Sequence, residues 1–267
     1  MNILILGTGI IEQKLINLCL KSHLLDHIYT ASNEPLEDIP NIEYSSPEEL
    51  LQKAKRIQAD LILVTNKILI QEGLVDFLKK NMLNVISVNQ KWFNLESSRL
   101  VAKRLLNYYS INNPEVILAP LTFPIVLKTD KPELTKIVYS MQELIKTRAE
   151  FSAINIFLEE YLKGELFYIL SLWDGKNLIH FNQKMELTEV QQDRLDLYKT
   201  KLCFMLSDEK ADFTGFFTTK LIWAKNDWHV LEYIMHINEK SPLDSINKDF
   251  LYILNSAIYQ KLNEISS

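Results

Sequence analysis

Two glycines after the first apolar segment are the first residues whose spacing suggests ligand chemistry. Residues 2–6 (NILIL) run into Gly7 and Gly9, and a glycine-rich turn between a strand and a helix can bring backbone N–H groups to a phosphate. A dinucleotide-binding turn also requires a third glycine and an acidic residue at the end of the second strand. This chain has Glu12 at the third position and no acid in residues 29–32 (YTAS). We therefore interpret the turn as a tight strand-to-helix connection, which disfavours a nicotinamide or flavin oxidoreductase.

No other group of reactive side chains has a spacing that suggests chemistry. The sequence lacks the G-x-S-x-G motif that presents a nucleophilic serine. Cys19 and Cys203 stand in apolar surroundings outside any C-x-x-C pattern, so we interpret them as small buried hydrophobic residues of a reducing compartment. The histidines lack metal-ligand spacing; they are His23, His27, His180, His229 and His236.

The composition limits the kinds of partner. The 267 residues include 29 Lys and Arg against 34 Asp and Glu, for a formal charge of -5, so no nucleic-acid-binding face is expected. No apolar segment approaches the roughly 20 residues that span a membrane, and the N-terminus lacks a signal-peptide pattern, which together predict a cytoplasmic protein without membrane contact. Only six residues are glycine, about 2% against an average of about 7%, so glycine-rich phosphate loops are poorly supplied.

Strand-like and helix-like patterns alternate over the first ninety residues. Residues 59–65 (ADLILVT) are apolar almost throughout, as in a strand buried on both faces of a parallel sheet. Ser46 followed by Pro47 predicts the start of a helix. Repeated β–α units of this kind predict a doubly wound layer. The expected strands are 2–6, 27–31, 59–65 and 84–88, and the expected helices are 10–22, 47–57 and 68–81.

The pattern changes beyond a boundary that we place within residues 90–120. Asp174-Gly175 is a strong two-residue hairpin signal, Asn226-Asp227 is a second turn, and Ser241-Pro242 predicts the start of a last helix. The expected helices are 92–110, 132–147, 188–206 and the one that begins at 241, and the expected strands are 124–129, 153–161, 166–173, 177–182, 213–224 and 228–237.

Several short segments are informative because of the order in which they occur along the chain. They are residues 1–9 (MNILILGTG), 60–78 (DLILVTNKILIQEGLVDFL), 95–106 (LESSRLVAKRLL), 124–130 (PIVLKTD), 158–165 (LEEYLKGE) and 213–233 (FTGFFTTKLIWAKNDWHVLEY). In this order and at this spacing they resemble the motifs of the phosphoribosylamine–glycine ligase (glycinamide ribonucleotide synthetase) family. This purine-biosynthesis family is part of the ATP-grasp superfamily.

The resemblance implies a fold of α/β and α+β parts. A Rossmann-like pre-ATP-grasp domain would span residues 1–92. A reduced ATP-grasp domain would follow over residues 93–267, with a smaller subdomain at about 118–170 and a C-terminal helix. In this superfamily, a nucleotide is held between two subdomains while a carboxylate is phosphorylated and then captured by an amine, with Mg²⁺ on the phosphates.

The resemblance also assigns roles to residues where the motifs match. Lys128 matches a phosphate-contacting lysine, and Arg99 stands where the family has the lysine of G-S-K. Residues 159–162 match a hinge whose backbone binds adenine. The alternatives are a solvated lysine for Lys128 and an ordinary acidic strand end for the hinge. The implied cofactor-binding residues are Arg99, Lys128, Glu159, Glu160, Tyr161, Leu162 and Glu165, and the implied metal ligand is Glu232, at the glutamate of V-x-E-F-N.

Other motifs of the family are absent. Where the family has the glycine-rich loop G-L-A-A-G-K-G, residues 131–137 read KPELTKI, and Pro132 is expected to begin a helix there. Residues 65–67 (TNK) replace the substrate motif G-P-E, and neither H-K-R nor T-G-G-M-G-A is found. The chain is also expected to be shorter than the family at its C-terminal end.

The metal motif is only half present. Ile234 stands at the asparagine that follows the metal-binding glutamate, and an apolar side chain cannot bind Mg²⁺. His236 and Glu239 are at best partial substitutes for the arginine and aspartate further on.

These differences set two hypotheses for the function. The first is a degraded homologue without ligase activity, which acts as a binding or interaction protein with weak or absent affinity for ATP and Mg²⁺. The alternative is a divergent ATP-dependent carboxylate–amine ligase with another substrate. The expected partners are an adenine nucleotide and a protein.

Overall fold

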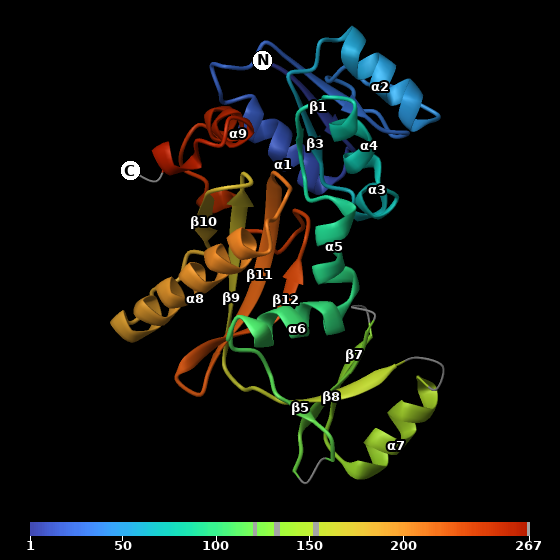
Figure 1. The fold of residues 1–267 in the computed structure, drawn as a ribbon. Coiled ribbons are helices and arrows are strands. Elements are labelled where there is room, and N and C mark those ends of the chain that lie inside the picture. The colour runs from blue at the N-terminus through green and yellow to red at the C-terminus, as the bar shows by residue number, and fades with distance from the viewer. Residues whose placement is uncertain (120–121, 131–133, 152–154, 266–267) are drawn as a thin grey trace.

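Three four-stranded sheets follow one another along an elongated molecule (Figure 1). The structure is a computed structural model that describes residues 1–119, 122–130, 134–151 and 155–265. A sheet built from the N-terminal residues lies at one end, an antiparallel sheet lies in the middle, and a small sheet with its own helix lies at the other end. Within the described ranges, no helix has both the length and the apolar character needed to cross a lipid bilayer.

The first sheet is parallel and covered on both faces. Along its central strand, Leu4 and Leu6 pack in one hydrophobic cluster with residues of α2 and α4, whereas Ile3 and Ile5 pack in another with residues of α1. This division follows from the period of two in a strand and confirms the doubly wound layer. The strand order is β2-β1-β3-β4, with β1 (Asn2–Leu6), β2 (His27–Ala31), β3 (Leu61–Val64) and β4 (Val85–Ile86), and the helices are α1 (Ile10–Cys19), α2 (Pro47–Arg56), α3 (Lys67–Gln71) and α4 (Leu74–Lys80).

Two helices that the sequence pattern predicts as continuous are each divided. Gly73 has a left-handed backbone with φ of 81° and separates α3 from α4 within residues 68–81. Ser98 is extended, with φ of -130° and ψ of 107°, and separates α5 (Gln90–Ser97) from α6 (Arg99–Tyr108). The Ser98 hydroxyl accepts a hydrogen bond from the backbone N–H of Val101, which caps α6. The break at Ser98 turns α6 toward the small sheet (Figure 1).

The middle sheet is antiparallel, and one long helix covers one of its faces. The Tyr198 hydroxyl of α8 (Glu189–Asp208) lies 2.9 Å from the hydroxyl of Thr219 in β11. Because side chains alternate along a strand, Thr218, Lys220 and Ile222 point to the opposite face. The strand order is β10-β9-β11-β12, with β9 (Glu165–Trp173), β10 (Leu178–Asn182), β11 (Gly215–Ala224) and β12 (Asp227–Ile234). Both predicted hairpins are confirmed, but the second turn lies at Lys225-Asn226, one residue before the predicted pair, because Asp227 already pairs with Ala224.

The small sheet corrects the helix predicted for residues 132–147. Residues 135–138 form strand β7 (Thr135–Val138), which pairs antiparallel with β6 (Ile125–Thr129), and only then does α7 (Met141–Glu150) begin. The Ser140 hydroxyl accepts from the N–H of Glu143, so the helix starts after Ser140 and not at Pro132. Pro132 itself and its neighbours at 131 and 133 lie outside the described residues. The remaining strands are β5 (Val116–Ile117) and β8 (Ile156–Glu160), in the order β5-β8-β6-β7.

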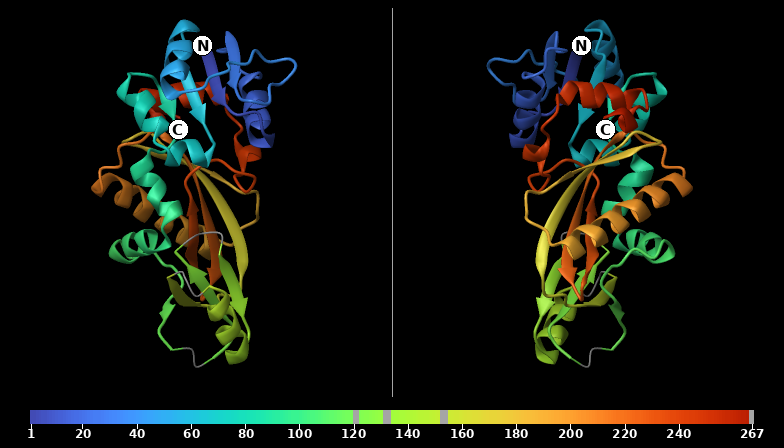
Figure 2. Two further views of the ribbon diagram at one scale, coloured as in Figure 1. Left: turned by 90° about the vertical axis from the view of Figure 1, so that its right-hand side faces the viewer. Right: turned by 90° about the vertical axis from the view of Figure 1, so that its left-hand side faces the viewer.

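The C-terminal segment returns to the first sheet, as the right-hand view of Figure 2 shows. The prediction of one helix from Ser241 is wrong: a 3₁₀ turn at Leu243–Ser245 comes first, and α9 (Phe250–Ile258) begins after Asp249, whose carboxylate accepts from the N–H of Tyr252. A further 3₁₀ turn lies at Leu262–Glu264. Helix α9 packs beside α1 on the face of the sheet that carries Ile3 and Ile5. The ring of Phe250 stacks 6.1 Å from that of Phe216 in the middle sheet.

This packing predicts that Phe250→Ala is strongly destabilising. The Phe250 side chain is 2% exposed, so its removal leaves a cavity between two sheets and is expected to lower the free energy of unfolding by about 3–5 kcal/mol. Tyr252→Ala on the same helix is the control, because Tyr252 is 47% exposed. Urea denaturation followed by circular dichroism measures both, and equal losses for the two variants would contradict the packing described for α9.

Candidate functional site

A cleft opens where the middle sheet, α6 and the small sheet meet. It consists of two adjoining cavities of about 300 and 410 Å³, within the usual size of small-molecule sites. The first cavity extends along α5, α6 and β12, and the second extends between β11 and the segment that joins β8 to β9. The residues that line both are Arg99, Pro114, Lys128, Glu159, Leu231 and Glu232.

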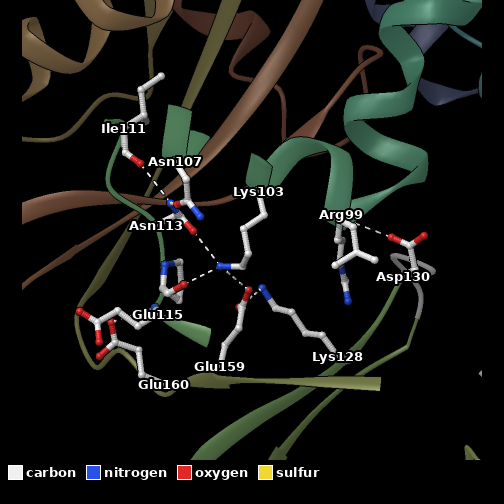
Figure 3. A network of polar contacts seen from close by, with 12 residues as sticks. Arg99, Lys103, Asn107, Ile111, Asn113, Glu115, Lys128, Asp130, Glu159 and Glu160 are labelled. Carbon is white, nitrogen blue, oxygen red and sulfur yellow. Dashed lines mark hydrogen bonds and ion pairs between the residues drawn. The ribbon is translucent and has the colours of Figure 1, made fainter. Parts of the chain in front are cut away.

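Glu159 holds two lysines at the centre of this cleft. Its carboxylate lies 2.8 Å from the ammonium group of Lys103 on α6 and 2.6 Å from that of Lys128 on β6 (Figure 3). All three side chains are almost completely buried. The alternative of a solvated lysine is therefore wrong for Lys128. Glu159 and Glu160 do end strand β8, so the hinge and the ordinary acidic strand end both stay predictions for residues 159–162.

The two lysines leave a positive charge that Glu159 does not neutralise. Burial lowers the pKa of the Lys128 ammonium below its ordinary value, and the nearby charges of Arg99 and Lys103 act in the same direction, while Glu159 raises it. Two ammonium groups on one carboxylate, with a guanidinium beside them, make this end of the cleft suitable for an anion.

Lys103 is the residue of this cluster that the sequence motifs did not reveal. It lies four positions after Arg99 on α6 and therefore on the same helix face. Its ammonium group also donates to the side-chain oxygen of Asn113 at 2.7 Å and to the carbonyl of Pro114 at 2.5 Å, which holds the start of the small sheet against α6 (Figure 3). The spacing from Arg99 was the signal that could have revealed it.

Arg99 connects α6 to the turn between β6 and β7. Its guanidinium donates to the carbonyls of Thr129 at 3.4 Å and Leu134 at 3.3 Å. The Ser98 hydroxyl and the N–H of Leu100 both donate to Asp130, at 3.0 and 3.2 Å. The described ends of this turn are thus held against the N-terminus of α6, and Arg99 lies at the wall of both cavities.

The segment between β8 and β9 presents unpaired backbone groups to the cleft. Among the residues that the structure describes, the N–H and C=O groups of Leu162 and Lys163 have no hydrogen-bond partner, although both residues line the larger cavity. Gly164 follows, and a Cβ there would lie 1.8 Å from the carbonyl oxygen of Trp223, so only glycine permits this close approach to β11.

Apolar side chains complete the wall around these backbone groups. They are Val126, Ile137, Leu162, Leu166, Ile222 and Leu231. A flat aromatic base with edge donors and acceptors fits such a wall, since its faces contact apolar side chains and its edge reaches the backbone. Among the predicted residues, Tyr161 and Leu162 line the cavity, as does Glu160, which is ion-paired with Lys225. Glu165 is exposed and does not line either cavity.

The position expected to bind a metal does not fit one. The Glu232 carboxylate lies 3.2 Å from the ammonium group of Lys220, which stands directly opposite on β11. Within the described ranges, no group of three His, Cys, Asp or Glu side chains is placed to hold a metal ion. His236 is ion-paired with Glu96 at 2.9 Å, and Glu239 is exposed, so neither joins Glu232.

The glycine turn of the first sheet is occupied by a side chain of the chain itself. The carboxylate of Glu12 folds back against Gly7 and Gly9 and accepts a hydrogen bond from the Thr65 hydroxyl. An anion at this helix N-terminus would meet that carboxylate, so the interpretation of the turn as a structural connection is supported by its geometry.

Comparisons with known proteins agree with this architecture. Residues 1–96 match the family described as phosphoribosylglycinamide synthetase, N domain. Across 99% of its length the chain is 23% identical to the phosphoribosylamine–glycine ligases of Fusobacterium nucleatum and Clostridium acetobutylicum, of which it covers 75% and 76%.

Solved structures show the same fold at low sequence identity. The phosphoribosylamine–glycine ligase of Thermotoga maritima matches with a TM-score of 0.76 at 17% identity, over 97% of this chain and 76% of that one. The D-alanine–D-alanine ligase of Bacillus anthracis, solved in complex with ATP, matches with a TM-score of 0.64 at 19% identity, over 99% and 98%.

The chain shares the fold of these ATP-grasp ligases, which confirms the predicted mixed α/β fold class. Within that superfamily, the relatives of this chain are the phosphoribosylamine–glycine ligases, so the family predicted from the sequence motifs is also confirmed.

The ion-pair cluster predicts that Glu159→Gln destabilises the protein. The change keeps the shape of the side chain but leaves two buried ammonium groups without their carboxylate, and breaking a buried pair in this way is expected to cost about 3–5 kcal/mol. Glu160→Gln is the control, because Lys225, its partner, is 56% exposed, and exposed pairs contribute about 0–1 kcal/mol. Chemical denaturation measures both. A Glu159→Gln variant as stable as the parent would refute the role given to this carboxylate.

Proposed function

We propose that this protein binds an adenine nucleotide in the cleft and does not ligate glycine to phosphoribosylamine. The observation that carries the proposal is the pairing of two features in one continuous space: unpaired backbone groups of Leu162 and Lys163 beside an apolar wall, and a cluster of buried cations further along. A base at one end and phosphates at the other would satisfy both. The Bacillus anthracis ligase, which shares the fold, was solved with ATP bound, and this is consistent with the assignment.

Each wall of the cleft would have a distinct role. The backbone of residues 161–163 would donate to and accept from the edge of the base, and Leu162 and Ile222 would contact its faces. Lys128, Lys103 and Arg99 would bind the phosphates, since they leave positive charge beyond what Glu159 neutralises. A bound Mg²⁺ would neutralise phosphate charge in a ligase of this fold, but the pairing of Glu232 with Lys220 and the presence of Ile234 argue against a site for it here.

The residues at the position of the family's substrate motif also support the proposed loss of ligase activity. The Thr65 hydroxyl donates a hydrogen bond to Glu12, and Asn66 caps α3. Two residues at the position of the family's G-P-E motif therefore make contacts that stabilise the fold. Loss of a single electrostatic contact in an active site commonly costs on the order of 10²–10³ in rate. Here several positions differ together, which favours a binding protein over a catalyst.

A divergent ATP-dependent carboxylate–amine ligase is the second candidate. The observation in its favour is the smaller cavity, which continues from the cation cluster past Lys67 and His236 and offers space for a second ligand beside a nucleotide. For either candidate we place the protein in the cytoplasm, in a reducing environment that suits its free Cys19 and Cys203. A protein partner and the division into domains at residue 92 remain part of this proposal.

Nucleotide binding is predicted to stabilise the folded protein. At about 100 times its dissociation constant, a ligand raises the free energy of unfolding by about 2.7 kcal/mol, so ATP or ADP is expected to raise the melting temperature measurably in at least one of two buffers, with Mg²⁺ or with EDTA. Lys128→Met is expected to weaken binding by on the order of tenfold or more, because it removes a charged contact. The control is Lys199→Met, whose partner Asp196 lies on the exposed side of α8.

The proposal has two failure points. If neither nucleotide shifts the melting temperature in either buffer, the proposed nucleotide binding is refuted. Release of ADP that depends on both glycine and phosphoribosylamine would refute the proposed loss of ligase activity and favour an active ligase.

A further inference from the structure

Lys220 and Glu232 form an ion pair inside the larger cavity. The two residues face each other in the register of β11 and β12, and the side chains are 27% and 32% exposed. The register shifts between Lys220 and Leu221, so an irregularity in the strand pair lies directly beside the lysine. Irregularities of this kind bend a strand and redirect side chains next to ligand sites.

The alternation of side chains along β11 directs Lys220 into the larger cavity. Thr219 and Leu221, its neighbours along the strand, are buried toward α8, and Lys220 and Ile222 both line the cavity on the other face. Among the described residues, Glu232 is the partner that the structure gives the Lys220 ammonium group. An ammonium group has three N–H donors, so this pairing leaves donors for an anion in the cavity.

We propose that the Lys220 ammonium group takes the place of a divalent cation, so that the cleft binds an adenine nucleotide without metal. This inference rests on the proposed function. A lysine fixed against a carboxylate supplies positive charge at the wall where a metal ion would otherwise be needed. A divalent ion at Glu232 would have to displace Lys220 or lie next to it, where like charges repel.

The charges around the cavity support a metal-free ligand. Its lining contains four cationic side chains, Arg99, Lys128, Lys163 and Lys220, and three carboxylates, Glu159, Glu160 and Glu232. Each of these carboxylates is already paired with a lysine, Glu159 with two of them. The described residues of the larger cavity therefore offer phosphate oxygens positive charge but offer an incoming metal ion no carboxylate without a lysine.

The first test compares nucleotide binding in two buffers. Titration calorimetry with ADP and with ATP, in EDTA and in excess MgCl₂, is expected to give affinity in EDTA that is at least as high as in MgCl₂. Binding that requires Mg²⁺ would overturn the inference and leave the proposed function intact. No binding in either buffer would overturn both.

Two variants of the ion pair separate this role from a structural one. Lys220→Gln is expected to weaken binding in EDTA by on the order of tenfold, and because Glu232 is then without its lysine, Mg²⁺ is expected to restore part of the affinity. Glu232→Gln is expected to strengthen binding in EDTA, because it releases the ammonium group from its carboxylate. A pair that only supported the sheet would weaken binding in both variants, and that result would overturn the inference.

The control variant changes a lysine that lies outside the cleft. Lys261→Gln removes a lysine whose partner, Glu264, lies in the last 3₁₀ turn away from the cleft, and its affinity is expected to equal that of the parent. Melting curves without nucleotide check that each variant folds. If Lys220→Gln binds as tightly as the parent in EDTA, Lys220 has no part in binding.

Discussion

The carboxylate of Glu159 connects the two halves of the cleft. It extends from β8 of the small sheet, yet its partners lie on β6 and on α6, so one buried group ties a strand to its neighbour and to the helix that leads back to the first sheet. Isolated buried lysines are strongly disfavoured, and Lys103 and Lys128 are tolerated because this carboxylate lies between them. Arg99 lies on the same helix as Lys103, and residues 161–163 directly follow β8, so that connection also helps to position both.

Internal contacts fill two of the places where the family's motifs imply a ligand. At the expected metal position, a lysine is paired with Glu232, and at the glycine turn, Glu12 occupies the space where an anion would bind. Each substitution replaces a place for a ligand with an internal contact. The cation cluster around Glu159 has no such replacement: two lysines share one carboxylate there, with Arg99 nearby at the wall of the cavity.

The sequence predicted those helix starts and turns that are determined by residues close together in the chain. Ser46 and Pro47 begin α2, and Asp174-Gly175 joins β9 to β10, because capping and turn residues act over a few positions. The helix expected from Pro132 is a strand and a later helix, since pairing with β6 outweighs local propensity. Among site residues, Lys128 and Glu159 followed from family motifs, whereas Lys220 could not be found in this way: its importance comes from lying opposite Glu232, and the register of a strand pair is not visible in either strand alone.

The return of α9 to the first sheet affects how the chain can fold as it is synthesised. Residues 2–86 supply the strands of a layer whose second face is completed by residues 250–258. Until the ribosome has released that last helix, part of the apolar face with Ile3 and Ile5 lacks its cover. Contacts between segments so far apart in sequence form slowly, so the nascent N-terminal layer leaves part of its apolar face open to chaperones until α9 docks.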